Sequence, residues 1–403
     1  MNESERFRAS ILADYGANDS EIKELLTYNQ NVFQHDCLST SLKFPLASEA
    51  HLADWSEYAA NAEDIGAFAV LKDVFVQWQF PIQSGISQTE AYRSATLKSG
   101  ECDCHNSHAG LMLQQPETLH LTIHQSLAGA IPVLSVKHRE DFVTIVRSLT
   151  KRNEPESIPP SMGACIVSGY NNWARIRNYK QQWQQQNLKA DPQAWDAEFK
   201  RLISHKELYQ DRFLILSQEF YSNIAPEQLG LTAAEWRDLS FKIRLEHECT
   251  HYFTYRLFKS MRNNLLDELI ADYAGIVAAT GSYRADWFLH FMGLEAPAYR
   301  EGGRLQNYRG QPPLSTGAFK ILQRLLRAAA FNLERFDRGC RASPKDSVSR
   351  RHRIYTQSNK TDNLSLIVFG LTYLTIEELA SSQASDRIYK ILASLQETLL
   401  AAN

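Results

Sequence analysis

The chain contains no run of apolar residues that approaches the roughly 20 needed for a helix to cross a bilayer. The longest apolar stretch, residues 270–280, carries Asp272 and fits a buried helix better. The amino-terminal residues are charged throughout and lack the apolar core of a secretory signal. Six cysteines in 403 residues are too few and too scattered for a disulfide scaffold. These absences favour a soluble, cytoplasmic protein with reduced thiols and no membrane span.

Neither sign of charge is in large excess, because 43 basic and 46 acidic side chains leave a net charge of −3. Such a balance creates no general field that attracts polyanions, so we expect no nucleic-acid partner. The sequence also contains no internal repeat and no glycine-rich phosphate loop of the Gly-Lys-Ser/Thr or GxGxxG type. Hydrophobic residues at 44% and charged residues at 22% are typical of a globular protein.

The amino-terminal part of the chain mixes helical and strand patterns. Residues 1–65 have a mostly helical pattern. Two strands and then a helix are predicted at residues 117–124, 131–136 and 138–149. The stretch 151–163 combines three prolines with charges and a glycine, which is typical of a loop or domain boundary. We therefore predict a mixed α/β region over residues 1–150 and a second domain over residues 151–403.

The second domain combines two predicted strands with a long helical region. The strands are expected at residues 164–168 and 213–217. A long helix follows Thr232, because Thr232 and Glu235 have the spacing of a capping box. Further helical patterns occur at residues 265–280, 315–336, 375–382 and 386–401. The expected fold class is α+β, with a mainly helical carboxy-terminal half.

The long predicted helix contains the sequence His-Glu-Cys-Thr-His at residues 247–251. Residues four apart lie on the same face of a helix, so His247 and His251 can bind one metal ion. Neutral imidazole is a ligand that Zn²⁺ prefers. Glu248 follows the first histidine and is angled to reach a water at the metal, as a general base must be. The alternative is an ordinary surface helix with ion pairs between residues four apart.

A third ligand is available on the next predicted helix, which Asn264 can cap. Two helices joined by a short connection pack antiparallel, so Glu268 in the first turn can face the histidine pair. Two histidines, one carboxylate and a water make a zinc site with an open position. Asp272 lies four residues after Glu268 on the same face, where it can accept the remaining N–H of an imidazole ligand.

The sequence HECTHYFTY followed by DELIADYAG resembles the active-site helix pair of the gluzincin metallopeptidases, thermolysin-like enzymes in particular. The resemblance implies a zincin-like catalytic domain within residues 151–403. It also implies a role for each matching residue: zinc ligands at His247, His251 and Glu268, the general base at Glu248, and a carboxylate behind a histidine at Asp272.

The resemblance raises two further expectations. In zincins an edge strand before the active-site helix binds extended substrate through backbone hydrogen bonds, and residues 213–217 come at that place in the chain. An ordinary buried strand is the alternative. A second donor besides zinc must stabilise the oxyanion of the tetrahedral intermediate. The residues considered for this role are His290, Tyr299, Arg304, Tyr308 and His352.

The expected function is zinc-dependent hydrolysis of a peptide or other amide bond, with a peptide or protein as substrate. A non-catalytic zinc-binding regulatory or scaffold protein is one alternative. A general base beside the ligands argues against it, because a purely structural site has no use for such a base. A structural zinc site is also usually closed by four protein ligands. A metallohydrolase with a non-peptide substrate is the other alternative, since the motif does not specify the substrate.

Several weaker signals have an ordinary explanation. Cys102, Cys104, His105 and His108 are cramped for one tetrahedral ion, so a polar loop is favoured over a second metal or thiol site. His120 and His124 share one face of a predicted strand, where histidines without metal are commoner. The helix turns Cys249 away from the histidine face, which favours a packing role. The basic run 350–353 is favoured as a solvated loop over a site for an acidic partner.

Overall fold

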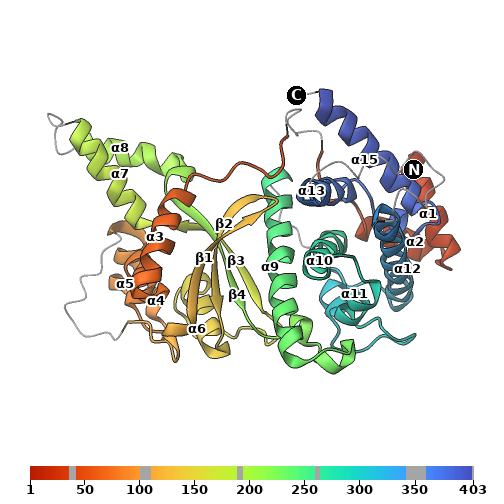
Figure 1. The fold of residues 1–403 in the computed structure, drawn as a ribbon, viewed down its shortest axis with the longest axis horizontal. Helices are drawn as coiled ribbons and strands as arrows, with labels where there is room; N and C mark the ends of the chain where they lie inside the picture. Colours follow the sequence, from red (N-terminus) through yellow and green to blue (C-terminus); the bar gives the residue numbers. More distant parts are fainter. Residues whose placement is uncertain (36–41, 100–109, 188–193, 259–263, 342–359, 402–403) are drawn as a thin grey trace. The chain divides into compact units, whose positions relative to one another are not determined.

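The computed structural model describes residues 1–35, 42–99, 110–187, 194–258, 264–341 and 360–401 (Figure 1). It has the α+β composition expected from the sequence, with helices and a four-stranded mixed sheet among the described residues. The chain divides into two compact units. Residues 47–219 form the sheet unit, and residues 1–46 together with 220–403 form the helical unit.

The sheet unit contains β1 (Leu119–Ser126), β2 (Gly129–Val136), β3 (Ala164–Asn171) and β4 (Gln210–Ser217), in the order β1-β2-β4-β3. The outer pairs β1–β2 and β3–β4 are antiparallel, whereas β2 and β4 run parallel. The strands predicted from the sequence therefore form. The expectation of an edge strand at residues 213–217 is wrong, because β4 pairs with a neighbour on each side. Its five residues Phe213 to Ser217 are all buried, as in an ordinary inner strand.

The core of the sheet unit lies on one face of the sheet. Side chains alternate between the two faces of a strand, so Leu134 with Val136 and Phe213 with Ile215 point to the same side. The helices that pack against these residues are α3 (Leu52–Ile65), α4 (Ala67–Val74) and α6 (Arg139–Thr150). A second apolar cluster involves α5 (Glu90–Ser94), α7 (Trp173–Gln186) and α8 (Ala194–Ser204).

The helical unit contains the helices predicted for the carboxy-terminal half of the chain. These are α9 (Ala233–Phe258), α10 (Leu265–Thr280), α11 (Ala285–Met292), α12 (Thr316–Arg341), α13 (Lys360–Leu371), α14 (Ile376–Ala380) and α15 (Ala384–Ala401). It also contains the two amino-terminal helices, α1 (Glu3–Asp14) and α2 (Asp19–Tyr28). A buried ion pair of 3.2 Å between Arg8 of α1 and Glu377 of α14 joins the two ends of the chain within this unit.

This division differs from the predicted boundary between residues 1–150 and 151–403. The loop at 151–163 does form, but it connects α6 to β3 inside the sheet unit. No helix among the described residues is both long and apolar enough to cross a membrane. The cysteine and histidine cluster at 102–108 and the basic run at 350–353 lie outside the described residues.

The two helices that carry the metal-ligand motif start where the sequence predicts. The N–H of Thr232 donates to the Glu235 carboxylate at 2.9 Å, and the N–H of Glu235 donates to the Thr232 hydroxyl at 3.3 Å. The side chain of Asn264 accepts from the N–H of Asp267 at 2.9 Å and caps α10. The helices α9 and α10 lie side by side (Figure 1). They approach closely at Gly275, where an added Cβ would lie 2.6 Å from the carbonyl oxygen of Ile243.

Candidate metal centre

Three residues of the helical unit bring metal-ligand atoms together at the contact of α9 and α10. His247 and His251 lie one turn apart on α9, and their Nε2 atoms are 3.0 Å from each other. The carboxylate of Glu268 on α10 lies 3.6 Å from Nε2 of His247 and 3.3 Å from Nε2 of His251. The three side chains are buried, with about 5% of each residue exposed. The face that carries the histidines is thus not the surface face of an ordinary solvated helix.

The spacing of these atoms suits a small tetrahedral ion. Ligand bonds of 2.0–2.1 Å in a tetrahedron put neighbouring donor atoms about 3.3 Å apart. The three separations of 3.0, 3.3 and 3.6 Å lie around that value. The donor set of two imidazole nitrogens and one carboxylate is also one that zinc prefers where a fourth position stays open.

Each histidine is oriented from behind by a carboxylate of α10. Asp272 lies 2.9 Å from Nδ1 of His247, as the sequence predicts. Asp267 makes the same 2.9 Å contact with Nδ1 of His251, which the sequence analysis missed. An Nδ1–H that donates to a carboxylate leaves Nε2 as the metal-binding atom. Asp267 directly precedes Glu268, so its place near the site could be inferred from the sequence. Which side chain it contacts depends on how α9 and α10 cross.

A third group of side chains surrounds the ligands from outside the two helices. Arg304 donates to the carboxylate of Asp272 and, at 2.8 Å, to the hydroxyl of Tyr221. The Tyr221 hydroxyl in turn donates to Asp272 at 2.7 Å. The guanidinium of Arg304 is also 3.6 Å from the carboxylate of Glu268. Burial and the nearby Glu268 carboxylate raise the pKa of Tyr308. Arg304 and Tyr308 come from a short 3₁₀ helix, η8 (Arg304–Tyr308).

Of the five residues considered as oxyanion donors, the structure brings Arg304 and Tyr308 to the candidate site. Tyr299 uses its hydroxyl to donate to the carbonyl of Gly303 at 3.0 Å. His290 lies on α11, and none of its described hydrogen bonds joins it to the three ligands. His352 lies outside the described residues.

The electrostatics of the site favour positive charge at its centre. Burial lowers the pKa of His251, but Asp267 and Glu268 outweigh burial and raise it well above its usual value. Burial likewise opposes ionisation of Glu268, yet the two histidines and Arg304 hold its pKa below the usual range. Arg304 contacts the carboxylates of Glu268 and Asp272, while that of Asp267 lies behind His251, so one guanidinium does not balance the carboxylates of the cluster and a divalent cation would offset the remainder. The residues therefore fit a zinc ion in donor type, spacing and charge.

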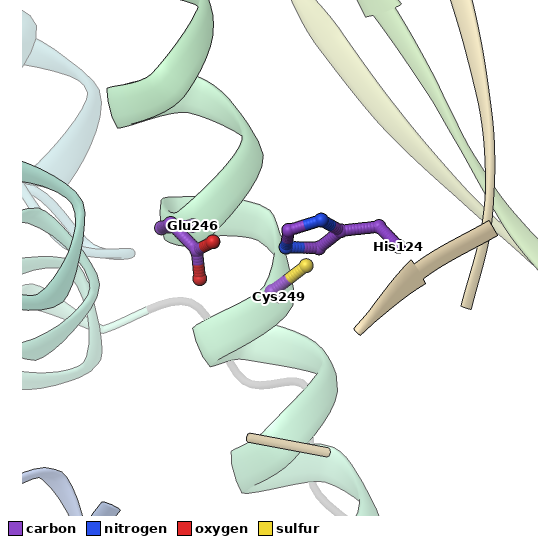
Figure 2. Close-up of side chains that lie close together, drawn as sticks. All are labelled: His124, Glu246 and Cys249. Atoms are coloured by element: carbon purple, nitrogen blue, oxygen red, sulfur yellow. The ribbon is translucent and has the colours of Figure 1, made fainter. Parts of the chain in front are cut away.

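Glu248 follows the first ligand on α9 and is half-buried. Among the described residues, no hydrogen bond or ion pair engages its carboxylate. Cys249 follows Glu248 on α9 and is 1% exposed. Figure 2 shows the side chains of Cys249 and Glu246 on this helix. Cys249 is two residues from His247 and so projects from a different face of the helix. His124, also drawn in Figure 2, belongs to β1 of the sheet unit.

Fold and site together define an α+β protein with a buried three-donor centre of the chemistry that binds a transition metal. The chain belongs to a family described as a family of unknown function, DUF7005, whose model matches residues 10–383. No curated protein and no solved structure shows a significant match to it.

Proposed function

We propose that this protein is a zinc-dependent hydrolase that cleaves peptide or other amide bonds. The observation that carries the proposal is the convergence of His247, His251 and Glu268, with a carboxylate behind each histidine and Glu248 beside the first ligand. The proposal also retains the zincin-like relationship that the two motif segments suggested.

Each residue has a distinct task in this proposal. Zinc bound by the three ligands would polarise the scissile carbonyl and lower the pKa of a water to about 7. Glu248 would accept the proton of that water and deliver it to the leaving amine. Asp267 and Asp272 hold the imidazoles in the orientation that directs both Nε2 atoms inward. Arg304 and Tyr308 bring N–H and O–H donors beside Glu268, where they could stabilise developing negative charge.

A non-catalytic zinc protein is the second candidate function. The burial of the three ligands favours it, since a ligand set that is about 95% buried also suits a structural role. Two observations favour catalysis instead. Within the part of the chain that the structure describes, three residues rather than four offer donor atoms to the centre, and the half-buried Glu248 has no partner that would explain it structurally.

Metal content and turnover, measured together, test the proposal. The purified protein should contain about one zinc per chain, and His251→Ala and Glu268→Ala should lose it. A library of quenched fluorescent peptides then reports cleavage, with Glu248→Gln as the matched inactive variant. That variant should keep its zinc and lose at least about a hundredfold in turnover, the lower range for a general base.

The outcomes separate the two candidate functions. Zinc binding without any cleavage would favour the non-catalytic protein. Cleavage that Glu248→Gln leaves unchanged would remove Glu248 from the mechanism. Cleavage of a non-peptide amide alone would keep the mechanism and change the substrate class. A native chain that takes up no zinc, even after zinc is added back, would contradict both the hydrolase and the non-catalytic zinc protein.

A further inference from the structure

The residues 293–315 between α11 and α12 form what we call the metal-site segment, because they carry Arg304 and Tyr308. Its position decides where the Arg304 guanidinium lies relative to Asp272 and Glu268. The segment contains the 3₁₀ helix η8 but no α-helix or strand of its own. The segment is held by backbone hydrogen bonds of its own and by contacts from neighbouring helices.

The amino-terminal helix α2 supplies two of those contacts. The hydroxyl of Tyr28 donates a hydrogen bond to the carbonyl of Tyr308. Burial raises the pKa of Tyr28 to about 12, so the hydroxyl remains a donor at neutral pH. The ring of Tyr28 lies against Gly310, where an added Cβ would come within 3.2 Å of it.

One turn earlier on α2, Glu24 fixes the end of the segment. Its carboxylate accepts from the N–H of Ser315 at 2.6 Å and from the Ser315 hydroxyl at 2.7 Å. The partners of Tyr28 and Glu24 are more than 250 residues away along the chain, so the contacts are tertiary and not part of a local turn. The helix α2 thus holds the metal-site segment both at η8 and at the start of α12.

We propose that Tyr28 and Glu24 are positioning residues for the metal centre: through the metal-site segment, α2 places Arg304 against Asp272 and Glu268. The chain of contacts runs from the Tyr28 hydroxyl to the backbone of Tyr308, four residues along η8 to Arg304, and then to the carboxylates that orient or supply metal ligands. The inference rests on the proposed zinc site for its effect on metal binding. The structural part, which concerns the segment alone, does not depend on that site.

Two variants remove the contacts with little change in shape. Tyr28→Phe deletes the hydroxyl but keeps the ring against Gly310, and Glu24→Gln keeps the size of the side chain. Lys23→Ala is the matched control, because Lys23 is an exposed residue of the same helix. Far-UV circular dichroism of each purified full-length variant verifies that it is folded before further measurement.

Hydrogen–deuterium exchange of the zinc-free protein tests the structural part. Amides of residues 304–308 should exchange at least about threefold faster in Tyr28→Phe than in the native chain and the Lys23→Ala control, since local opening becomes easier. Exchange within α9 and α10 should not change. Equal exchange of residues 304–308 in all three proteins would overturn the proposal whether or not the protein binds zinc.

A double-mutant cycle on zinc affinity tests the route through Arg304. Loss of a group in the outer shell costs about 10–100-fold in metal affinity, so Arg304→Gln should fall in that range and Tyr28→Phe near or below its lower end. The double variant should lose less than the product of the two single losses, because Tyr28 acts through the segment that carries Arg304. The visible spectrum of the cobalt-substituted protein should shift in Tyr28→Phe and not in Lys23→Ala.

Multiplicative losses in the double variant would show that Tyr28 affects the site independently of Arg304, which would overturn the proposal that α2 positions Arg304. Failure of the native chain to bind zinc or cobalt would instead remove the proposed metal site. In that case faster exchange at residues 304–308 would still establish α2 as the support of the segment.

Discussion

Asp267 accepts a hydrogen bond from His251 at 2.9 Å, just as Asp272 accepts one from His247 at 2.9 Å. It also accepts from the hydroxyl of Thr254 at 3.2 Å and is 1% exposed. The two carboxylates stand on one helix, five residues apart, on either side of Glu268. Both histidines therefore take an orienting carboxylate from α10, and the Tyr221 hydroxyl, 2.9 Å from Nδ1 of His247, adds a second contact to the first histidine.

This relationship predicts the effect of replacing Asp267. In Asp267→Ala the imidazole of His251 loses its partner, so the affinity for zinc should fall by about 10–100-fold. Asp267→Asn retains an acceptor oxygen and should lose less. Competition with a chromophoric chelator measures both constants, and Asp286→Asn, an exposed pair with Arg284, serves as the control. Equal affinities in the native chain and Asp267→Ala would show that the contact does not orient the ligand.

Zinc should also stabilise the protein against thermal unfolding, because the three ligands converge only in the folded helical unit. A free zinc concentration 100-fold above the dissociation constant adds about 2.7 kcal/mol. Calorimetry with and without a chelator should show the melting temperature rising with zinc, whereas His251→Ala and Glu268→Ala should show no rise. A rise of the same size in both variants would place the zinc elsewhere in the chain.

The convergence of the three candidate ligands was predictable from the sequence because the signals that place them are local. The spacing of His247 and His251 follows from one helical turn, and the capping side chains of Thr232 and Asn264 mark where α9 and α10 begin. Glu268 required only the further assumption of an antiparallel pair. The α+β class was predictable for the same reason, because strands and helices each have a characteristic spacing of apolar residues in the sequence.

The features that were missed depend on contacts between distant residues. Strand order places β4 inside the sheet, and no pattern within residues 213–217 distinguishes an inner strand from an edge strand. The buried pair of Arg8 with Glu377 brings α1 into the helical unit across most of the chain length. Arg304 was one of five residues considered as oxyanion donors, and only the folded segment brings it to Asp272.

The sheet unit contains a buried ion pair whose removal should be costly. The carboxylate of Asp211 is 0% exposed and accepts from Arg175 at 2.6 Å, from Asn172 at 2.7 Å and from Trp55 at 2.9 Å. All three partners are donors, so the amide NH₂ of an asparagine would face N–H groups. We expect Asp211→Asn to lose about 3–5 kcal/mol of unfolding free energy at pH 7, measured by urea denaturation.

That loss should depend on pH in a defined direction. Burial raises the pKa of Asp211 above its unfolded value of 3.8, although Arg175 and the neutral donors oppose the rise. A raised pKa contributes stability that is present below the unfolded pKa and is lost as pH rises through the folded pKa. The difference between native and Asp211→Asn should thus be larger near pH 3 than at pH 7. A difference that grows with pH would mean that the ion pair outweighs the cost of burial.

The last prediction concerns Gly303, the residue before Arg304. Its backbone has φ −63° and ψ 151°, which any residue can adopt. Close contacts with neighbouring atoms, and not the backbone conformation, therefore restrict this position to glycine. An added Cβ would lie 2.5 Å from Cα of Gly293 and 2.6 Å from the carbonyl oxygen of Met292. Both are backbone atoms that cannot rotate away. Alanine at this position must therefore displace the start of η8 and, with it, the guanidinium of Arg304.

Gly303→Ala should destabilise the protein by about 1–3 kcal/mol, the usual cost of forcing an extra carbon into a packed region. It should also weaken zinc binding in the same direction as Arg304→Gln, because Arg304 loses its contact with Asp272. Gly302→Ala is the matched control: its φ of +85° makes alanine strained, but nothing lies within 4 Å of the added carbon. That variant should cost about 1–2 kcal/mol and keep its zinc affinity. If both variants bind zinc equally well, the close approach of residues 293 and 303 does not position Arg304.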